Sequence, residues 1–237
     1  MKKYIKKIIQ EDDKKHIHII IPAAGIGRRM KSYGCKSLLR INGEHLIDLQ
    51  LETISKSVKS YDIILVTGFD SERLMYNTPE HIIKIENENY YSTNVARSIA
   101  MGMRATKDNE HILIIFGDLL FNTEALENID LSRSCIVISE DMEESEVGCN
   151  ISNKDNLEYM MFDLSNKWGH ILYLTGKELR LFKKLIYNKQ HDKKFCFEII
   201  NEVINQGGKF KCIIHDDIRI IDIDTSKDLQ KAQELIK

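Results

Sequence analysis

The chain has 237 residues, of which 43% are apolar and 30% are charged, enough for one sizeable α/β domain. Its 34 Lys and Arg residues nearly balance 36 Asp and Glu residues, so charge does not indicate nucleic acid or an anionic membrane as a partner. Purely apolar runs such as residues 19–21 and 112–116 are far shorter than the ~20 residues that span a bilayer, and no secretory apolar stretch follows the basic N-terminus. We expect neither a transmembrane nor a secreted protein.

The five cysteines are odd in number, and no two of them lie within four residues of each other. This spacing favours reduced thiols in a cytoplasmic protein over a disulfide framework or a structural zinc site. We find no internal repeat and no linker-like tract. We therefore predict an N-terminal extension at 1–15 and a single domain at 16–237.

Strands and helices are predicted to alternate in the first part of the chain. Apolar runs predict strands at residues 16–24, 63–67, 81–85, 111–116 and 135–139. Helical spacing predicts helices at residues 4–9, 44–58, 94–104 and 123–128. Such alternation favours an α/β fold with a doubly wound, mostly parallel mixed sheet flanked by helices, which is a Rossmann-like arrangement.

The pattern changes after about residue 140. Short strands at 147–151, 157–162 and 169–175 follow one another without helices between them, which predicts a small antiparallel patch. Helices are expected at 177–188 and 195–205, strands near 210–214 and 219–223, and a closing helix that Thr225 and Asp228 open with a capping-box pattern.

Several glycines and aspartates stand where the predicted strands end. They are Gly25, Gly68, the pair Gly117 and Asp118, and Asp224. Because ligands of open parallel sheets lie beyond the carboxyl ends of the strands, these positions indicate a ligand site.

The loop after the first strand combines small residues with basic ones. The small residues are Ala23, Ala24, Gly25 and Gly27, and the basic ones are Arg28, Arg29 and Lys36. Small residues let a ligand approach the main-chain N–H groups, and the cations add positive charge beside them. The combination predicts a polyphosphate site, with a tight turn whose arginines face solvent as the alternative.

Three common phosphate motifs do not fit this loop. The dinucleotide fingerprint G-x-G-x-x-G fails because Met30 replaces its last glycine. A P-loop is absent from the chain, and the partner motifs of a protein kinase are missing.

The loop and the segments after it carry a family resemblance. The first strand ends in Ala-Ala-Gly-Ile-Gly-Arg-Arg at 23–29, followed by Lys36-Ser37-Leu38, Gly43 and Leu46-Ile47. Further landmarks are residues 66–69, Asn94 with Ser98, Gly117-Asp118 and residues 221–229. The chain thus resembles the nucleotidyltransferases of the MobA-like and the sugar-phosphate or phosphocholine type, which have a GT-A-like fold. It departs from their pattern at Cys35, where a proline is expected before Lys36.

The resemblance implies a Mg²⁺-dependent enzyme, with Mn²⁺ as a substitute. It would transfer an NMP group, with CMP favoured, from an NTP to a small phosphorylated acceptor such as a phosphocholine-like molecule or a sugar phosphate, releasing pyrophosphate. Arg29 and Lys36 would be catalytic, and Asp118 and Asp224 would hold the metal. The implied nucleotide-binding residues are Ala23, Ala24, Gly25, Gly27, Arg28, Asn94 and Ser98.

Each polar candidate also has a structural interpretation. Asp118 is either a metal ligand or a turn residue, and Asn94 is either a nucleotide contact or a helix N-cap. Asp222 lies on the same strand face as Asp224, where it would support that residue, unless both simply face solvent. No general base is expected, because the attacking phosphate oxygen is already anionic near neutral pH.

Residues 140–208 are taken as the acceptor side. They contain Tyr159, Phe162, Trp168, Tyr173, Phe195 and Phe197, together with Glu198. The aromatic residues could form a cage for a quaternary ammonium group, but ordinary core packing is the favoured interpretation.

Two other functions remain open from the sequence. A glycosyltransferase that uses a nucleotide-sugar would share the sheet, but it would prefer Asp-x-Asp where Leu119 and Leu120 follow Asp118. A non-catalytic nucleotide-binding module is the other alternative. A homo-oligomer is possible but not indicated.

Overall fold

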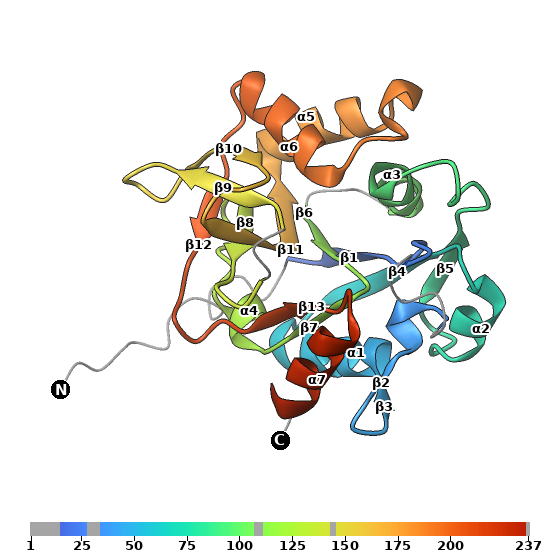
Figure 1. Cartoon of the computed structure of the whole chain (residues 1–237). Coiled ribbons are helices and arrows are strands. Elements are labelled where there is room, and N and C mark those ends of the chain that lie inside the picture. The colour runs from blue at the N-terminus through green and yellow to red at the C-terminus, as the bar shows by residue number, and fades with distance from the viewer. Residues whose placement is uncertain (1–14, 28–33, 107–110, 143–145, 236–237) are drawn as a thin grey trace.

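The computed structural model describes residues 15–27, 34–106, 111–142 and 146–235 (Figure 1). The expected helix at 4–9 and two predicted site residues, Arg28 and Arg29, lie outside these ranges.

A nine-stranded mixed sheet forms the centre of the molecule. Seven strands follow the order β10-β9-β11-β6-β1-β4-β5, and β8 pairs with both β11 and β12. The strands are β1 (Ile17–Pro22), β4 (Tyr61–Thr67), β5 (Ile83–Glu86), β6 (His111–Ile115), β8 (Cys135–Ile138), β9 (Gly148–Ile151), β10 (Leu157–Met161), β11 (Asn166–Thr175) and β12 (Lys211–Ile213).

Helices and short elements complete the fold. The helices are α1 (Leu46–Ser57), α2 (Ser71–Tyr76), α3 (Val95–Ala105), α4 (Glu124–Glu127), α5 (Gly176–Ile186), α6 (Cys196–Asn205) and α7 (Ser226–Leu235), with 3₁₀ turns η2 (Lys36–Leu38) and η3 (Lys189–His191). Two small ribbons pair β2 (Arg40–Ile41) with β3 (Glu44–His45) and β7 (Leu119–Phe121) with β13 (Ile220–Asp222).

Strand β1 lies between β4 and β6, and both pairings are parallel. All six of its residues are buried, as expected for a parallel strand covered on both faces. Strand β5 continues the parallel order, whereas β11 runs antiparallel to β6. The predicted fold class, a mostly parallel mixed sheet flanked by helices, is confirmed.

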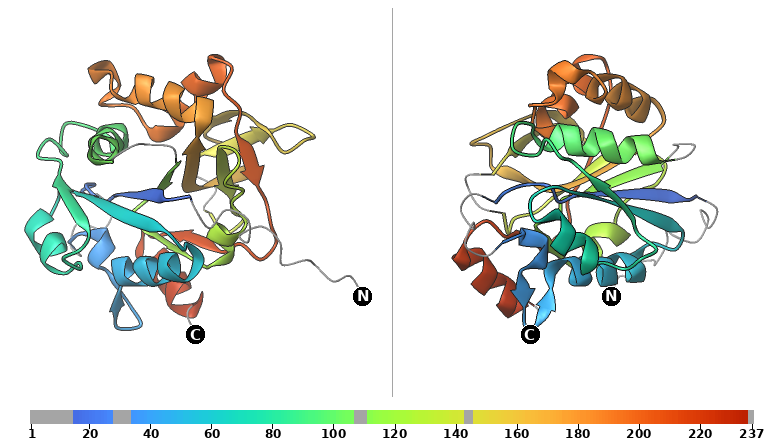
Figure 2. Two further views of the ribbon diagram at one scale, coloured as in Figure 1. Left: turned by 180° about the vertical axis from the view of Figure 1, so that it is seen from behind. Right: turned by 90° about the vertical axis from the view of Figure 1, so that its right-hand side faces the viewer.

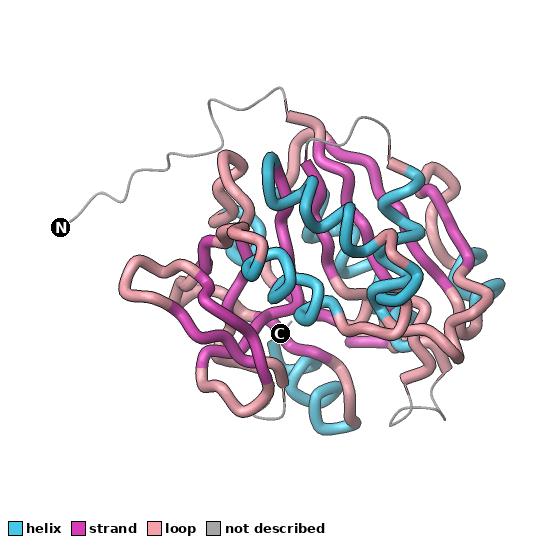
Figure 3. Tube along the Cα trace, turned by 90° about the horizontal axis from the view of Figure 1, so that it is seen from above, coloured by secondary structure: helices cyan, strands magenta, loops and turns pink. Residues whose placement is uncertain are grey.

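Helices cover both faces of the sheet (Figures 1 and 2). Ile20 and Ile114 point to the face covered by α3, α5 and α6, whereas Ile19 and Ile21 point to the face that α1, α2 and α4 cover. The view from above shows α3 and the helices next to it covering the strands (Figure 3). The alternation of these isoleucines follows from the two-residue period of a strand. A third core cluster, which includes Ile223, packs α7 against the β7–β13 ribbon.

The structure corrects part of the element assignment. The helix expected at 44–58 begins at Leu46, because Asn42 and Gly43 adopt φ of 50° and 99° and turn the chain into the β2–β3 hairpin. Helix α2 and strand β7 were not predicted. The predicted antiparallel patch is confirmed: β9, β10 and β11 pair antiparallel and extend the main sheet.

None of the described helices combines the length and the apolar character that crossing a membrane requires.

Candidate active site

A cavity of about 310 Å³ opens at the carboxyl ends of β1 and β6. The predicted residues that line it are Ala23, Ala24, Gly25, Gly27, Lys36, Asn94, Ser98 and Asp118. The N-termini of α3 and α6 and the residues Trp168 and His170 of β11 complete the wall. The cavity therefore lies between the loop after the first strand and the region expected to form the acceptor side.

The loop after β1 holds the side chain of Lys36 against Gly27. Gly27 has a φ of +57°, and a Cβ atom there would lie 3.1 Å from both Cγ and Cε of Lys36. A larger residue at this position would press on the lysine stem as well as strain the backbone. Gly27 thus leaves room for Lys36.

Close packing at Gly117 joins this loop to the end of β6. A Cβ atom on Gly117 would lie 2.8 Å from the Cβ of Ala23. The hydroxyl of Ser37 donates a 2.7 Å hydrogen bond to the carbonyl oxygen of Gly117. These contacts set the position of Lys36 relative to Asp118, which directly follows Gly117.

The ammonium group of Lys36 lies between two carboxylates. Its Nζ donates to Asp118 Oδ2 across 3.0 Å and also contacts Asp224 Oδ1. Burial alone would lower the pKa of Lys36, but the charges of Asp118, Asp222 and Asp224 raise it far above its usual value. Burial likewise opposes ionisation of Asp118, yet the charge and hydrogen bond of Lys36 lower its pKa. Lys36 and Asp118 are therefore both charged near neutral pH.

The β7–β13 ribbon brings these aspartates together from distant parts of the chain. Asp118 precedes β7, which pairs with β13, and the N–H of Ile223 donates a 3.0 Å hydrogen bond to the carbonyl oxygen of Asp118. Asp228 accepts hydrogen bonds from the backbone N–H groups of Asp224 and Thr225. The predicted capping box of Thr225 and Asp228 is thereby confirmed, and it also fixes the backbone of Asp224.

Three carboxylates can converge on one cation at this position. Oxygens of Asp118, Asp222 and Asp224 all lie within 4.8 Å of one another. Asp222 Oδ1 is buried and has no hydrogen-bond partner among the described residues. Oxygen ligands are those that Mg²⁺ prefers, so the residues present fit a magnesium ion.

Sequence reasoning missed the histidine beside this cluster. His170 Nδ1 lies 3.3 Å from Asp222 Oδ2, and Nε2 lies 3.6 Å from Glu146 Oε2. Its ring stacks on Phe116 and meets Trp168 edge-on. Burial alone would lower the pKa of His170, but its contacts with Asp222 and the charge of Glu146 raise it.

The backbone explains why His170 was missed. Its φ is +54°, and the pairing of β11 with β8 shifts register between Trp168 and Leu172. This bulge directs the side chain into the cavity. Gly169, inside a strand pattern, was the available signal for it.

The polar residues at the start of α3 are engaged with one another. The Asn94 side chain accepts a hydrogen bond from the N–H of Val95 and caps the helix, which is the structural alternative considered for it. The hydroxyl of Ser98 accepts a hydrogen bond from Asn87 Nδ2 across 3.2 Å. Both residues nevertheless line the cavity.

The aromatic candidates separate into two groups. Phe162, Trp168, Phe195 and Phe197 line the cavity. Phe197 meets Phe162 edge-on and stacks on Phe195. Tyr173 instead belongs to the core, where it bonds His111, and Tyr159 is exposed outside the cavity lining. Glu198 accepts a hydrogen bond from the N–H of Phe195 and so caps α6.

Comparison with known proteins agrees with this geometry. Residues 19–140, just over half of the chain, match the family described as MobA-like NTP transferase domain. The chain is 32% identical over 121 residues to a 2-C-methyl-D-erythritol 4-phosphate cytidylyltransferase of Prochlorococcus marinus, covering 50% of this chain and 52% of that protein. It is also 32% identical over 109 residues to the bifunctional protein GlmU of Buchnera aphidicola, covering 44% of this chain and 22% of that protein. The chain thus spans about half or less of these curated relatives.

Solved structures extend the fold comparison to most of the chain. A CTP:phosphocholine cytidylyltransferase from Streptococcus pneumoniae superposes with a TM-score of 0.77 at 18% identity, covering 93% of this chain and 99% of that one. An inositol-1-phosphate CTP transferase from T. maritima gives a TM-score of 0.75 at 18% identity, covering 92% and 94%. The resemblance inferred from the loop and strand ends is confirmed: the chain belongs to the family of MobA-like NTP transferase domains.

Proposed function

We propose that this protein is a Mg²⁺-dependent nucleotidyltransferase that transfers an NMP group, with CMP favoured, from an NTP to a small phosphorylated acceptor and releases pyrophosphate. The observation that carries the proposal is the position of the Lys36 ammonium. It lies between Asp118 and Asp224, at the edge of a cavity whose other side is the small-residue loop after β1.

The loop after β1 provides the binding surface for the triphosphate. Ala23, Ala24 and Gly25 expose main chain to the cavity because their side chains are small or absent. Lys36 neutralises phosphate charge beside them. Arg28 and Arg29, which lie outside the described residues, are assigned to the same charge neutralisation by their place in the motif.

The carboxylate cluster is the proposed metal site. Asp118 and Asp224 would hold Mg²⁺, with Asp222 within reach of the same ion. When bound, the ion neutralises the charge of the phosphoryl oxygens and of the departing pyrophosphate. In the structure, the Lys36 ammonium lies between Asp118 and Asp224, where it supplies positive charge to the same carboxylates that would hold Mg²⁺.

The reaction requires positioning more than proton transfer. An oxygen of the acceptor phosphate forms a bond to the α-phosphorus of the NTP, while the bond from that phosphorus to the pyrophosphate oxygen breaks. The attacking oxygen is already anionic, so no side chain has to remove a proton. Within the chain, the loop orients the triphosphate and the opposite wall orients the acceptor.

The opposite wall favours a phosphocholine-like acceptor over a sugar phosphate. Phe162, Phe195 and Phe197 present aromatic faces and edges to the cavity, and Glu146 adds a carboxylate. Aromatic rings beside an acidic group suit a quaternary ammonium. Similarity to a structure of a CTP:phosphocholine cytidylyltransferase supports both this acceptor and the choice of CTP.

Two further points bear on the proposal. Leu120, the position where a glycosyltransferase would place its second aspartate, is buried in β7, which disfavours that alternative. All five cysteines are free and buried, which is compatible with the proposed cytoplasmic location.

A pyrophosphate-release assay tests the proposal. CTP, UTP, GTP and ATP are each combined with phosphocholine and with sugar 1-phosphates, with Mg²⁺ and with a chelator. We expect release with CTP and phosphocholine, only in the presence of the divalent ion. An absence of release for every pair, with correctly folded protein, would contradict the proposed activity.

A further inference from the structure

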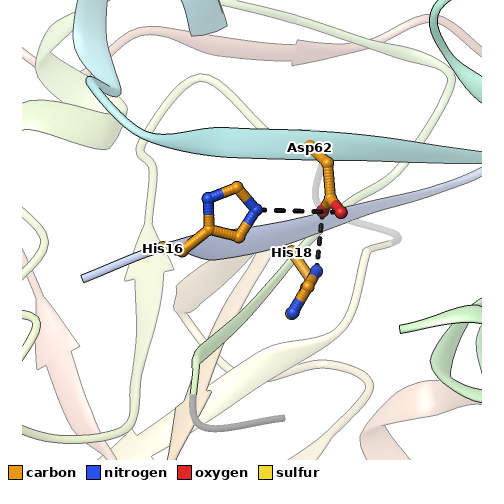
Figure 4. Close-up of side chains that lie close together, drawn as sticks. All are labelled: His16, His18 and Asp62. Carbon is orange, nitrogen blue, oxygen red and sulfur yellow. Dashed lines mark hydrogen bonds and ion pairs between the residues drawn. The ribbon is translucent and has the colours of Figure 1, made fainter. Parts of the chain in front are cut away.

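A second group of metal-binding side chains lies at the opposite end of the sheet from the cavity. His16 directly precedes β1, His18 is the second residue of β1, and Asp62 is the second residue of β4 (Figure 4). Ala23 of the cavity is five positions after His18, which corresponds to about 17 Å of strand. The group is therefore separate from the proposed active site.

The sheet itself places these three side chains together. His16 and His18 are two residues apart, so the strand geometry directs both rings to the same face. His18 and Asp62 are direct partners in the β1–β4 register. Figure 4 shows both imidazole rings directed at the Asp62 carboxylate, each with one ring nitrogen facing a carboxylate oxygen. No loop rearrangement is needed to form the group.

The distances between the ligand atoms of these residues are close to those found between the ligands of one bound metal ion. His18 Nδ1 lies 2.7 Å from Asp62 Oδ1, and His16 Nε2 lies 3.7 Å from Asp62 Oδ2. One ligand atom from each residue lies within 4.8 Å of the other two. Tetrahedral ligands at about 2.0–2.1 Å from zinc lie roughly 3.3 Å apart, so small side-chain rotations suffice to bind it.

Ser60 orients the more exposed of the two rings. Its Oγ lies 3.0 Å from His16 Nδ1. When Nδ1–H donates to that oxygen, Nε2 carries the lone pair and faces Asp62. A hydrogen bond to the second ring nitrogen is the usual way in which a metal-ligating histidine is held. With this hydrogen-bond direction, His16 Nε2 is available to bind a metal ion.

Exposure and ligand type indicate which ion fits. The side chains of His16 and Asp62 are 47% and 38% exposed, whereas that of His18 is 9% exposed, so an ion can enter from solvent onto an anchored ring. Imidazole nitrogens suit Zn²⁺ and related transition ions, whereas Mg²⁺ prefers the all-oxygen cluster of the cavity. We propose that His16, His18 and Asp62 bind a Zn²⁺-class ion that links β1 to β4, with water completing the coordination.

Zinc titration of chelator-treated protein without a polyhistidine tag tests the proposal. Isothermal calorimetry should show an equivalent of Zn²⁺ that His16→Ala removes. Asp222→Asn, which alters both the carboxylate cluster and the group of Glu146, His170 and Asp222, should leave that equivalent in place. Ser60 would contact the ligand His16 and not the ion, so Ser60→Ala should lower Zn²⁺ affinity by the roughly 10- to 100-fold typical of such partners. His16→Ala removes a ligand and should lower Zn²⁺ affinity by more than that. His215→Ala, at an exposed histidine 3.6 Å from Asp217, is the matched control and should bind as the parent does.

Visible absorption spectroscopy with Co²⁺, and the additional variant Asp62→Asn, test the same metal site without calorimetry. With Co²⁺ in place of Zn²⁺, the visible absorption of a four-coordinate nitrogen–oxygen site should appear in the parent and be lost in His16→Ala and Asp62→Asn. Far-UV circular dichroism verifies that both variants are folded. Equal Zn²⁺ binding by the parent and a folded His16→Ala protein, or a thiolate charge-transfer band with Co²⁺, would overturn the proposal.

Discussion

The backbone N–H of Ile223 donates a hydrogen bond to the carbonyl oxygen of Asp118 across 3.0 Å. This bond joins the carboxyl ends of two segments that are about a hundred residues apart in the chain. It places Asp224, one residue after Ile223, beside Asp118 and within reach of the Lys36 ammonium. Backbone pairing thus positions Lys36, Asp118 and Asp224 relative to one another. Substitutions of these three side chains should therefore leave the strands that carry them in place.

Replacing Asp118 tests the metal site. Asp118→Asn should lower kcat by at least about 100-fold, because it removes a charge that would hold the metal. Its melting temperature should stay nearly unchanged, because the loss of the Lys36 ion pair is offset by relief of the repulsion that raises the pKa of neighbouring Asp222. Thermal unfolding and steady-state pyrophosphate release measure the two effects. Asp216→Asn, at an exposed position, is the control; a large loss of stability in Asp118→Asn would indicate a structural role instead.

Replacing Lys36 should have the opposite effect on stability. Lys36→Met removes the cation that lies between Asp118 and Asp224, so metal-free protein should lose about 1–3 kcal/mol of unfolding free energy. This is less than for a fully buried pair, because the side chains of Lys36, Asp118 and Asp224 remain 12%, 27% and 25% exposed. Added Mg²⁺ should restore more stability to Lys36→Met than it adds to the parent, and turnover should stay low.

Lys84→Met is the matched control for Lys36→Met. Lys84 donates to the carbonyl oxygens of Met75 and Thr78 at 2.9 Å and contacts no carboxylate in these bonds. Lys84→Met should lower the free energy of unfolding, and Mg²⁺ should stabilise this variant no more than it stabilises the parent. Chemical denaturation with and without Mg²⁺ distinguishes the two variants, and equal rescue of both would exclude the role assigned to the cluster.

Gly27 should be required for the position of Lys36. Gly27→Ala places a Cβ atom 3.1 Å from the lysine stem and holds alanine at a φ of +57°, at a cost of about 1 kcal/mol in backbone strain. We expect both a lower melting temperature and a large loss of kcat. Gly43→Ala also has a positive φ, +99°, but nothing lies within 4 Å of its added Cβ. It should lose stability alone, and a matching loss of kcat there would argue against the steric explanation.

Much of the fold could be predicted from local pattern. The buried strand at 17–22 contains four isoleucines, interrupted only by His18, and such an apolar strand indicates a central parallel position in the sheet. The positions of Gly25 and Asp118 at strand ends predict one shared ligand edge, because parallel strands end on the same side. The placement of Lys36 against Asp118 agrees with that expectation, whereas its assigned catalytic role stays a prediction.

What the sequence did not reveal depends on non-local pairing. Strand β7 has three residues, and it is defined by its partner β13, which lies far downstream. The position of His170 depends on a bulge and a positive φ in β11, neither of which a side-chain pattern encodes. His16 and Asp62 come from different strands, so only the β1–β4 register shows that they meet. In each case the missing information was a register between separate segments.

The buried pair Asp222–His170 should make the metal-free protein more stable in mild acid. Burial and the charge of Asp118 raise the pKa of Asp222 to about 7, and its contacts with His170 only partly oppose this. Burial would lower the pKa of His170, but Asp222 and Glu146 raise it. The folded state therefore binds more protons than the unfolded state from about pH 4 to above pH 7, and stability falls as pH rises through this range.

Melting temperatures in a chelating buffer between about pH 5 and pH 8 measure this slope. Asp222→Asn should flatten it, because the raised carboxyl pKa is removed. Asp130→Asn is the control: partial burial would raise the pKa of Asp130, but hydrogen bonds from Ser132 and the charge of Arg133 lower it. Stability from Asp130 is then lost only as pH falls below about 4, outside the measured range. A slope that is unchanged in Asp222→Asn would contradict the assignment.

The phenylalanines that line the cavity, Phe162, Phe195 and Phe197, should determine the affinity for a cationic acceptor. The side chain of Phe195 lies at the cavity edge, stacked on Phe197 with ring centroids 5.8 Å apart. If it faces a quaternary ammonium, Phe195→Ala should raise the KM for phosphocholine by roughly 5- to 30-fold, which corresponds to a cation–π contribution of about 1–2 kcal/mol. The KM for CTP should not change, because the triphosphate binds at the opposite loop. Tyr76→Ala, at a ring that is 89% exposed on α2, controls for loss of a surface aromatic residue. Comparable losses with phosphocholine and with a sugar 1-phosphate would show that Phe195 only packs the wall, since a neutral sugar gains nothing from the ring's negative face.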